Sequence, residues 1–145
     1  CDPRPEHIEA WEVNGVERIV GMPDDVVRDF AVDVRTCIVA LSHDPKLDDL
    51  ALLEALHGPA FYIGAIGSRR NSQLRRERLI EHFGETPASL ERLRGPIGLY
   101  IGSKTPAEIA VSVMAEILAA KNGVSVPSEF SIASSKAYEE GPESR

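Results

Sequence analysis

Short apolar runs alternate along residues 18–118 with segments in which apolar side chains recur at helical spacing. Residues 36–41 (TCIVAL) form a nearly continuous apolar run, which predicts a strand that is covered on both faces. Further strands are predicted at 60–66 and, shorter, at 17–20. Strands that alternate with helical segments are typical of βα units in a parallel sheet. The pattern therefore predicts an α/β fold around a parallel sheet.

The residues at the ends of the helical segments predict where the helices begin and end. Pro23 is followed by two acids in a first turn, where the helix dipole favours negative charge. Gly84 is a natural stop, and Thr105 with Glu108 has the spacing of a capping box. The predicted helices cover residues 23–30, 44–58, 69–83 and 105–120.

Composition and charge exclude several classes of partner. Sixteen Lys and Arg against 23 Asp and Glu give a net charge of −7, which disfavours binding to nucleic acid or to anionic membranes. No apolar run approaches the roughly 20 residues of a membrane helix. The cysteines lack CxxC spacing, so we expect a reducing, cytoplasmic location. Cys37 is expected to be a small buried hydrophobe, and Cys1 favours a fragment of a longer protein over a lipoprotein.

The composition changes after Asn122 and Gly123 to Ser, Glu, Pro and Lys. Residues 1–121 are therefore predicted to form one domain, and residues 122–145 a C-terminal extension. An ordered polar extension usually lies against its own domain or against a neighbouring protomer. This favours a homo-oligomer, most simply a homodimer.

The loop after the 36–41 strand carries two candidate binding residues. In parallel sheets, ligands bind where strands end and helices begin. His43 at such a strand end could donate to a ligand oxygen, relay a proton or ligate a metal; it could also simply bond a loop carbonyl. Asp44 could contact a ligand, although Asp before Pro is also an ordinary helix N-cap.

The loop after the 60–66 strand resembles half of a phosphate loop. Without side chains, Gly64 and Gly67 let the backbone approach a ligand. The run Ser68, Arg69 and Arg70 places two cations at a helix start, where the dipole disfavours them. An anionic ligand would remove this conflict; alternatively, the arginines pair with surface acids. Hydrolysis and metal catalysis have no support, since GxSxG and HExxH motifs are absent.

Three ordered segments carry a family resemblance: SHDPKLD, YIGAIGSRR and the Gly-punctuated PIGLYIGSKTPAEIA that contains Gly98. Together they resemble the C-terminal Rossmann-like domain of the XdhC/CoxI family of molybdenum hydroxylase accessory proteins. The likeness runs from Asp2 to about Ala120. It implies a three-layer Rossmann-like sheet with helices on both faces that lacks its first βα unit. Asp2 would then stand at the acidic position that bonds a ribose in dinucleotide folds.

The resemblance implies a cofactor-binding chaperone rather than an enzyme. Such proteins bind the molybdenum cofactor while a cysteine desulfurase-type sulfurtransferase adds a sulfido ligand, and deliver it to xanthine or carbon monoxide dehydrogenase-type hydroxylases. Gly67, Ser68 and Arg69 would hold the phosphate, and His43 with Asp44 would meet the pterin edge. The full expected cofactor-binding set is Asp2, His43, Asp44, Gly64, Gly67, Ser68, Arg69, Arg70 and Gly98.

Two other interpretations stay open. An NAD(P)-dependent oxidoreductase domain would use Asp2 for a ribose and His43 as an acid, but there is no GxGxxG loop. The other is a purely structural or dimerising fragment whose site is empty. Ser42, Ser72 and Tyr100 stand where the family usually has Thr, His and Asp. Without a first strand, the sheet is expected to leave an exposed edge, covered by upstream residues or by another chain.

Overall fold

Parallel strands form the centre of the fold in the computed structural model, which describes residues 1–134. The strands β1 (Cys37–Ala40), β2 (Tyr62–Ala65) and β3 (Leu93–Arg94) lie side by side in this order. β1 pairs with β2 from Cys37 and Tyr62 to Ala40 and Ala65, and β2 pairs with β3 through Ile63 and Leu93. The predicted α/β, Rossmann-like parallel sheet is confirmed.

The helices between the strands begin and end close to the predicted positions. They are α1 (Pro5–Glu9), α2 (Pro23–Asp29), α3 (Pro45–Leu56), α4 (Arg69–Phe83) and α5 (Pro106–Lys121), with 3-10 turns η1 (Ser89–Arg92) and η2 (Ser128–Phe130). The short helix α1 was not predicted. Gly84 ends α4 with a φ of 72°, a left-handed conformation that glycine adopts without steric cost. Within residues 1–134, none of the helices has the length and apolar character that crossing a membrane requires.

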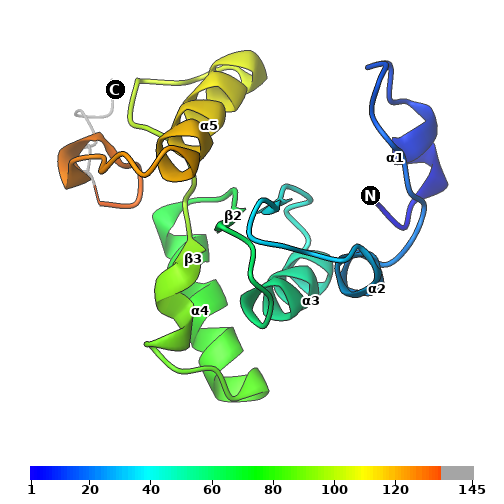
Figure 1. Ribbon diagram of the computed structural model, residues 1–145, viewed down its shortest axis with the longest axis horizontal. Coiled ribbons are helices and arrows are strands. Elements are labelled where there is room, and N and C mark those ends of the chain that lie inside the picture. Colours follow the sequence, from blue (N-terminus) through cyan, green and yellow to red (C-terminus); the bar gives the residue numbers. More distant parts are fainter. Residues whose placement is uncertain (135–145) are drawn as a thin grey trace, which may run out of the picture.

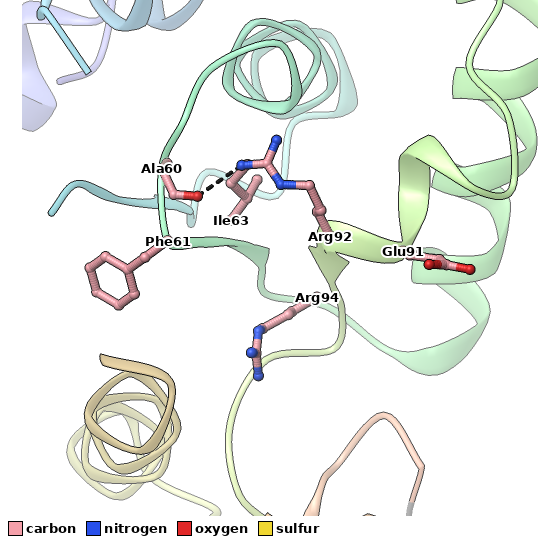
Figure 2. Close-up of a pocket in the computed structure, with 6 residues that line it drawn as sticks. All are labelled: Ala60, Phe61, Ile63, Glu91, Arg92 and Arg94. Carbon is pink, nitrogen blue, oxygen red and sulfur yellow. Dashed lines mark hydrogen bonds between the residues drawn. The ribbon is translucent and has the colours of Figure 1, made fainter. Parts of the chain in front are cut away.

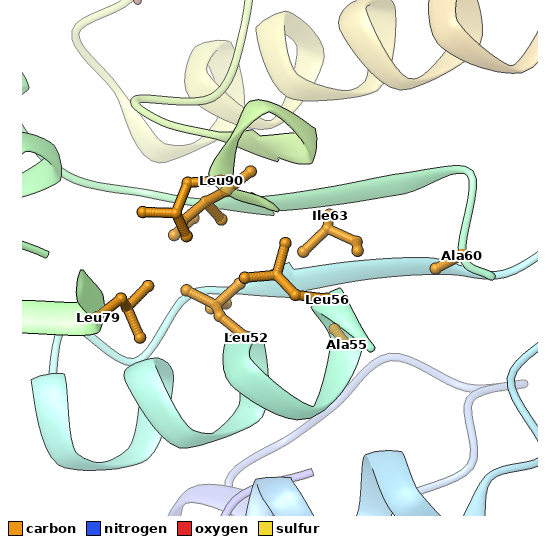
Figure 3. Packing of buried hydrophobic residues seen from close by; sticks show 10 residues of the cluster. Leu52, Ala55, Leu56, Ala60, Ile63, Leu79 and Leu90 are labelled. Carbon is orange, nitrogen blue, oxygen red and sulfur yellow. The ribbon is translucent and has the colours of Figure 1, made fainter. Parts of the chain in front are cut away.

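Helices cover both faces of the sheet, so the fold has three layers. In Figure 1, α3 and α4 lie on one side of the strands, and α5 (yellow to orange) lies on the other. Figure 3 shows the larger cluster, in which α3, α4 and η1 pack against Ile63 of β2. The smaller cluster joins Tyr62, the preceding residue of β2, to Val113 and Ile117 of α5. Successive residues of β2 therefore enter opposite cores, as strand geometry requires.

β1 is more exposed than its sequence predicted. The strand covers four residues, of which only Ala40 is buried, and Leu41 is 57% exposed. Cys37 is half-buried rather than fully buried, and this burial raises the pKa of its thiol. The physical reason is that β1 is an edge strand among the described residues, paired only with β2. The exposed sheet edge was predicted; what covers it stays a prediction.

The other two predicted strands are shorter than expected. β2 covers Tyr62–Ala65 instead of residues 60–66. The strand predicted at 17–20 is reduced to one parallel bridge between Asp2 and Val20, in which Asp2 N–H donates to Ile19 O (3.1 Å). This bridge lies outside the main sheet, so few interactions support a longer strand.

Part of the predicted C-terminal extension lies against its own domain. Ser131 forms an antiparallel bridge with Leu99, in the loop that follows β3. The rest of the extension, residues 135–145, lies outside the described residues. The division of the chain at residue 121 and the homodimer stay predictions.

The Thr105→Ala variant tests the capping box of α5. Thr105 Oγ1 accepts a hydrogen bond from Glu108 N–H (3.3 Å), and Glu108 Oε2 accepts one from Thr105 N–H (3.0 Å). Loss of the cap should lower the free energy of unfolding by about 1 kcal/mol, measured by urea denaturation. Lys104→Ala is the control, because Lys104 joins this network only through its backbone N–H. An equal loss in both variants would contradict the cap.

Candidate functional site

The loops that follow the three strands meet at one edge of the sheet. Ile66 N–H, after β2, donates to Ala40 O at the end of β1 (3.0 Å). Ile97 N–H, after β3, donates to Ala65 O at the end of β2 (3.2 Å). Because ligands of parallel α/β sheets bind at the carboxyl ends of the strands, this edge is the candidate functional site.

The loop after β1 holds His43 in a left-handed conformation, with a φ of 61°, and exposes its side chain. Ser42 Oγ donates to Asp48 Oδ1 (2.6 Å) and accepts from Asp44 N–H (3.0 Å), so a buried carboxylate of α3 positions the loop. Positive φ is uncommon for residues with a Cβ and clusters at functional sites. The geometry thus presents an exposed imidazole at the sheet edge.

Arg4 interacts with both carboxylates that were predicted to bind the ligand. Its Nε and Nη2 donate to Asp2 Oδ1 and Oδ2, each at 2.8 Å. These bonds hold the pKa of Asp2 well below its usual range. Asp44 also attracts the Arg4 guanidinium, and its Oδ1 accepts from Lys46 N–H (2.9 Å), which caps α3. Both carboxylates therefore already have protein partners, and Asp44 is a helix N-cap.

The loop after β2 brings hydrogen-bond donors to the start of α4. Gly67 has a φ of 147°, and Ser68 Oγ accepts from Asn71 N–H (3.1 Å) to cap the helix. Ser68, Arg69 and Arg70 lie at the surface of this turn, with both arginines exposed. Arg70 makes no ion pair in the part of the chain that the structure describes, whereas Arg69 Nε donates to Ile132 O (3.1 Å). Two guanidiniums thus stand at a helix N-terminus, where an anion is the favoured partner.

Gly64 and Gly98 are packing positions in this structure. Both are buried. A Cβ on Gly64 would lie 2.4 Å from Ile97 Cγ2, and one on Gly98, whose φ is 109°, would lie 2.4 Å from Ser112 Oγ. Their missing side chains let β2 and the loop after β3 approach neighbouring elements. Sequence spacing alone could not separate this packing role from the predicted ligand contact.

Sequence reasoning missed a buried ion cluster beneath the site. Arg75 of α4 donates from Nε to Asp49 Oδ1 (3.0 Å), and its Nη2 lies 3.7 Å from Asp48 Oδ2. Arg78 donates from Nε to Asp49 Oδ2 (2.8 Å). The cluster joins α3 to α4 and, through Asp48, positions Ser42. The adjacent acids in one helix and two arginines at helical spacing in the next were the available signal.

A second buried polar group was also missed. Glu116 of α5 accepts from Tyr62 Oη (2.6 Å) at Oε1 and from Gly98 N–H (3.3 Å) at Oε2. Burial, and then the Glu116 carboxylate, raise the pKa of Tyr62. The Arg94 guanidinium lies 5.1 Å from the centre of the Tyr62 ring. These contacts join α5, β2 and the loop after β3 beside the site.

The six residues drawn in Figure 2 line an open cavity of about 370 Å³ at the amino ends of β2 and β3, away from the candidate site. Arg92 there donates to Leu56 O (2.9 Å), Gly58 O (2.9 Å) and Ala60 O (2.8 Å), while Glu91 points away. Arg92 is thus used to link the turn η1 to the end of α3. Among residues 1–134, no group of three or more His, Cys, Asp or Glu side chains is placed to hold a metal ion.

A protein-family model matches most of the chain and identifies its family. The model of the family described as the XdhC Rossmann domain matches residues 1–117. The chain belongs to the XdhC family. The matched residues include the loops after β1, β2 and β3, so the candidate site lies within the part that the XdhC domain defines. Residues 118–134 of the described structure lie beyond the match.

This XdhC domain is similar to three curated proteins and spans less than a third of the length of each. They are the uncharacterized protein YqeB of Escherichia coli (strain K12), 39% identical over 92 residues; the molybdenum cofactor insertion chaperone PaoD of the same strain, 31% over 86; and a protein of Bacillus subtilis (strain 168) described as a probable xanthine dehydrogenase subunit, 32% over 108. The alignments cover 63%, 59% and 74% of this chain, but only 17%, 27% and 30% of the relatives.

A solved structure agrees with the fold. The crystal structure of a xanthine dehydrogenase from Bacillus halodurans superposes with a TM-score of 0.68 and 28% sequence identity. The superposition covers 84% of this chain and 34% of that chain. The Rossmann-like assignment therefore holds for both the sequence and the structure of this XdhC domain.

Proposed function

We propose that this XdhC domain belongs to a cytoplasmic maturation factor that binds the molybdenum cofactor and delivers it to a molybdenum hydroxylase. The observation that carries the proposal is the start of α4, where Ser68, Arg69 and Arg70 gather at a helix N-terminus with both arginines exposed. Such a group of donors suits a phosphate. The similarity to PaoD, a molybdenum cofactor insertion chaperone, supports the proposal that this phosphate is the phosphate group of molybdopterin.

The residues at the sheet edge fit the two polar ends of a pterin phosphate. Arg69 and Arg70 would bind the phosphate, with the Ser68 hydroxyl as a further donor. The donor set supports this fit, because the hydroxyl and both guanidiniums belong to exposed residues at the N-terminus of a long helix. His43 would contact the polar edge of the pterin. The cofactor itself supplies the dithiolene sulfurs that hold the metal, so the chain needs only to bind and orient it.

In this proposal the domain is a carrier and not a catalyst. A cysteine desulfurase-type sulfurtransferase would add the sulfido ligand to the cofactor. The enzyme that receives the cofactor would be a hydroxylase of the xanthine or carbon monoxide dehydrogenase type. The dinucleotide alternative is disfavoured, because both carboxylate oxygens of Asp2 already accept hydrogen bonds from Arg4. A ribose would have to displace those bonds.

A handover experiment tests the carrier role. The full chain is loaded with molybdenum cofactor without oxygen, separated from free cofactor and mixed with a cofactor-free hydroxylase, whose activity is then followed. Wild type should restore activity, whereas Arg69→Ala and Arg70→Ala should retain about 10-fold to 100-fold less cofactor, since each loses a charge-assisted bond. Arg35→Ala, an exposed arginine before β1, is the matched control. Equal retention by all four proteins would reject the assigned phosphate site.

The strained backbone at His43 gives a second prediction. His43→Gly should leave the free energy of unfolding equal or raise it by up to about 1 kcal/mol, because glycine relieves a φ of 61°. Ala31→Gly, at a φ of 55° beyond the end of α2, should have the same effect on stability. Only His43→Gly should reduce cofactor retention. Urea denaturation and the retention assay measure the two effects; a large loss of stability in His43→Gly would contradict them.

We also propose that the domain forms a homodimer through α5. Val111, Met114 and Leu118 are 63%, 51% and 48% exposed and lie at helical spacing on one side of this helix. Light scattering after size-exclusion chromatography should give twice the chain mass for wild type and the single chain mass for Met114→Glu. A wild-type monomer at tens of micromolar would reject this interface.

A further inference from the structure

The segment Ser128–Ile132, which we name the C-terminal strap, lies across the loop that follows β3. Tyr100 N–H donates to Phe130 O (2.7 Å), and Ile132 N–H donates to Gly98 O (3.2 Å). Between these bonds, Ser131 forms the antiparallel bridge with Leu99. The strap thus adds a short strand to a loop at the carboxyl edge of the sheet, beyond the residues that the family model matches.

The strap also contacts the proposed phosphate site. Ile132 O accepts a hydrogen bond from Arg69 Nε (3.1 Å). A carbonyl oxygen carries partial negative charge, so it takes a donor that a phosphate oxygen would otherwise take. Arg69 therefore cannot direct this N–H to a ligand while the strap is in this position.

Much of the strap is exposed to solvent in the part of the chain that the structure describes. Its largest side chain, Phe130, is 52% exposed. Ile132 is half-buried, and its Cδ1 packs close to Gly98. A cavity of about 350 Å³ lies beside the strap, between it and α5. Polar groups line much of it: Arg94, Glu116, Ser125, Ser128, Ser131 and Ser134. An exposed segment of this kind, beside a cavity, belongs to the less stable parts of a fold.

We propose that the C-terminal strap is a displaceable gate that competes with the anionic ligand for Arg69. This inference rests on the proposed function, since it assumes that the start of α4 binds a phosphate. With the strap closed, Arg69 is held by Ile132 O; with the strap released, its guanidinium turns to the phosphate. The apparent affinity for the ligand is then reduced by the fraction of molecules that are closed.

The Ile132→Pro variant should open the gate without changing a residue of the phosphate site. Proline removes the N–H that donates to Gly98 O and retains a carbonyl at the same position. Ile132→Val is the matched control, because it keeps the N–H at position 132 that donates to Gly98 O. Both are made in the full chain, and circular dichroism with thermal unfolding verifies that each remains folded.

Inorganic pyrophosphate, titrated by calorimetry, is the probe that tests the gate independently of the cofactor. Ile132→Pro should bind it about threefold to tenfold more tightly than wild type and Ile132→Val, as expected for the loss of one hydrogen bond that holds the strap closed. Arg69→Ala in the Ile132→Pro background should abolish the gain. Unchanged or weaker binding by Ile132→Pro, or a gain that persists without Arg69, would overturn the gate.

A parallel titration with molybdopterin separates failure of the gate from failure of the proposed function. If Ile132→Pro gains affinity for pyrophosphate and no variant binds molybdopterin, the gate stands and the carrier function is rejected. If molybdopterin binds equally to wild type and Ile132→Pro, the function stands and the gate is rejected. Hydrogen exchange of the strap should quicken when molybdopterin binds; slower exchange would make the strap a part of the ligand site and overturn the gate.

Discussion

Arg75→Met should lower the free energy of unfolding by about 3–5 kcal/mol, the usual cost of removing one member of a buried ion cluster. The Arg75 side chain is 7% exposed, and the side chains of Asp48 and Asp49 are 5% and 7% exposed. Removal of the guanidinium leaves two carboxylates in the protein interior without their main cation. Methionine retains most of the volume of the arginine side chain, so the loss of stability would come from the missing charge rather than from a cavity. Urea denaturation measures it.

Arg78→Met is the matched control for that cluster. Arg78 bonds the same Asp49 carboxylate at 2.8 Å, but its side chain is 34% exposed, so water can replace it. Its loss should cost about 1 kcal/mol or less, as for partly exposed ion pairs. In the Arg75→Met background, Asp49→Asn should recover part of the stability because one uncompensated charge is gone. Equal costs for the two arginine variants would contradict a buried cluster.

Gly98→Ala should lower the free energy of unfolding by about 2–5 kcal/mol, the sum of backbone strain and overpacking. Its φ of 109° is a conformation that residues with a Cβ rarely adopt, and the added Cβ would lie 2.4 Å from Ser112 Oγ. Ser112 is buried and donates to Leu99 O (2.6 Å), so it cannot move away freely. The midpoint of thermal or urea unfolding measures the loss.

Gly102→Ala separates the two contributions. Gly102 has a φ of 75°, but nothing lies within 4 Å of the position its Cβ would take. The substitution should therefore cost only the backbone strain, about 1–2 kcal/mol. If both alanine variants lost the same stability, the close packing of Gly98 against α5 would have no energetic role.

The fold could be predicted from local signals. Thr105 and Glu108 indicated the start of α5, Gly84 the end of α4, and the apolar runs the strands, because capping and periodicity depend on residues close in sequence. The exposure of β1 could not be predicted in the same way. It depends on whether a second strand lies beside it, and TCIVAL gives no information about its neighbour.

The sequence predicted where the candidate site residues lie better than it predicted which residues they bond. His43 and Arg69 lie at the expected edge, because strand order places the loops there. Their partners come from distant parts of the chain: Ile132 follows Arg69 by 63 residues, and Asp2 is bonded by Arg4 rather than left for a ribose. No local pattern encodes such contacts. Packing glycines and ligand-binding glycines likewise look the same in a sequence.

Competition between molybdopterin and NADPH for the full chain tests the central claim most directly. Calorimetry without oxygen would give both affinities for wild type, Arg69→Ala and His43→Ala. We expect molybdopterin to bind wild type, both substitutions to weaken this binding, and excess NADPH not to displace it. Tighter binding of NADPH than of molybdopterin, with loss of the bound molybdopterin on NADPH addition, would contradict the assignment of this edge to the molybdenum cofactor.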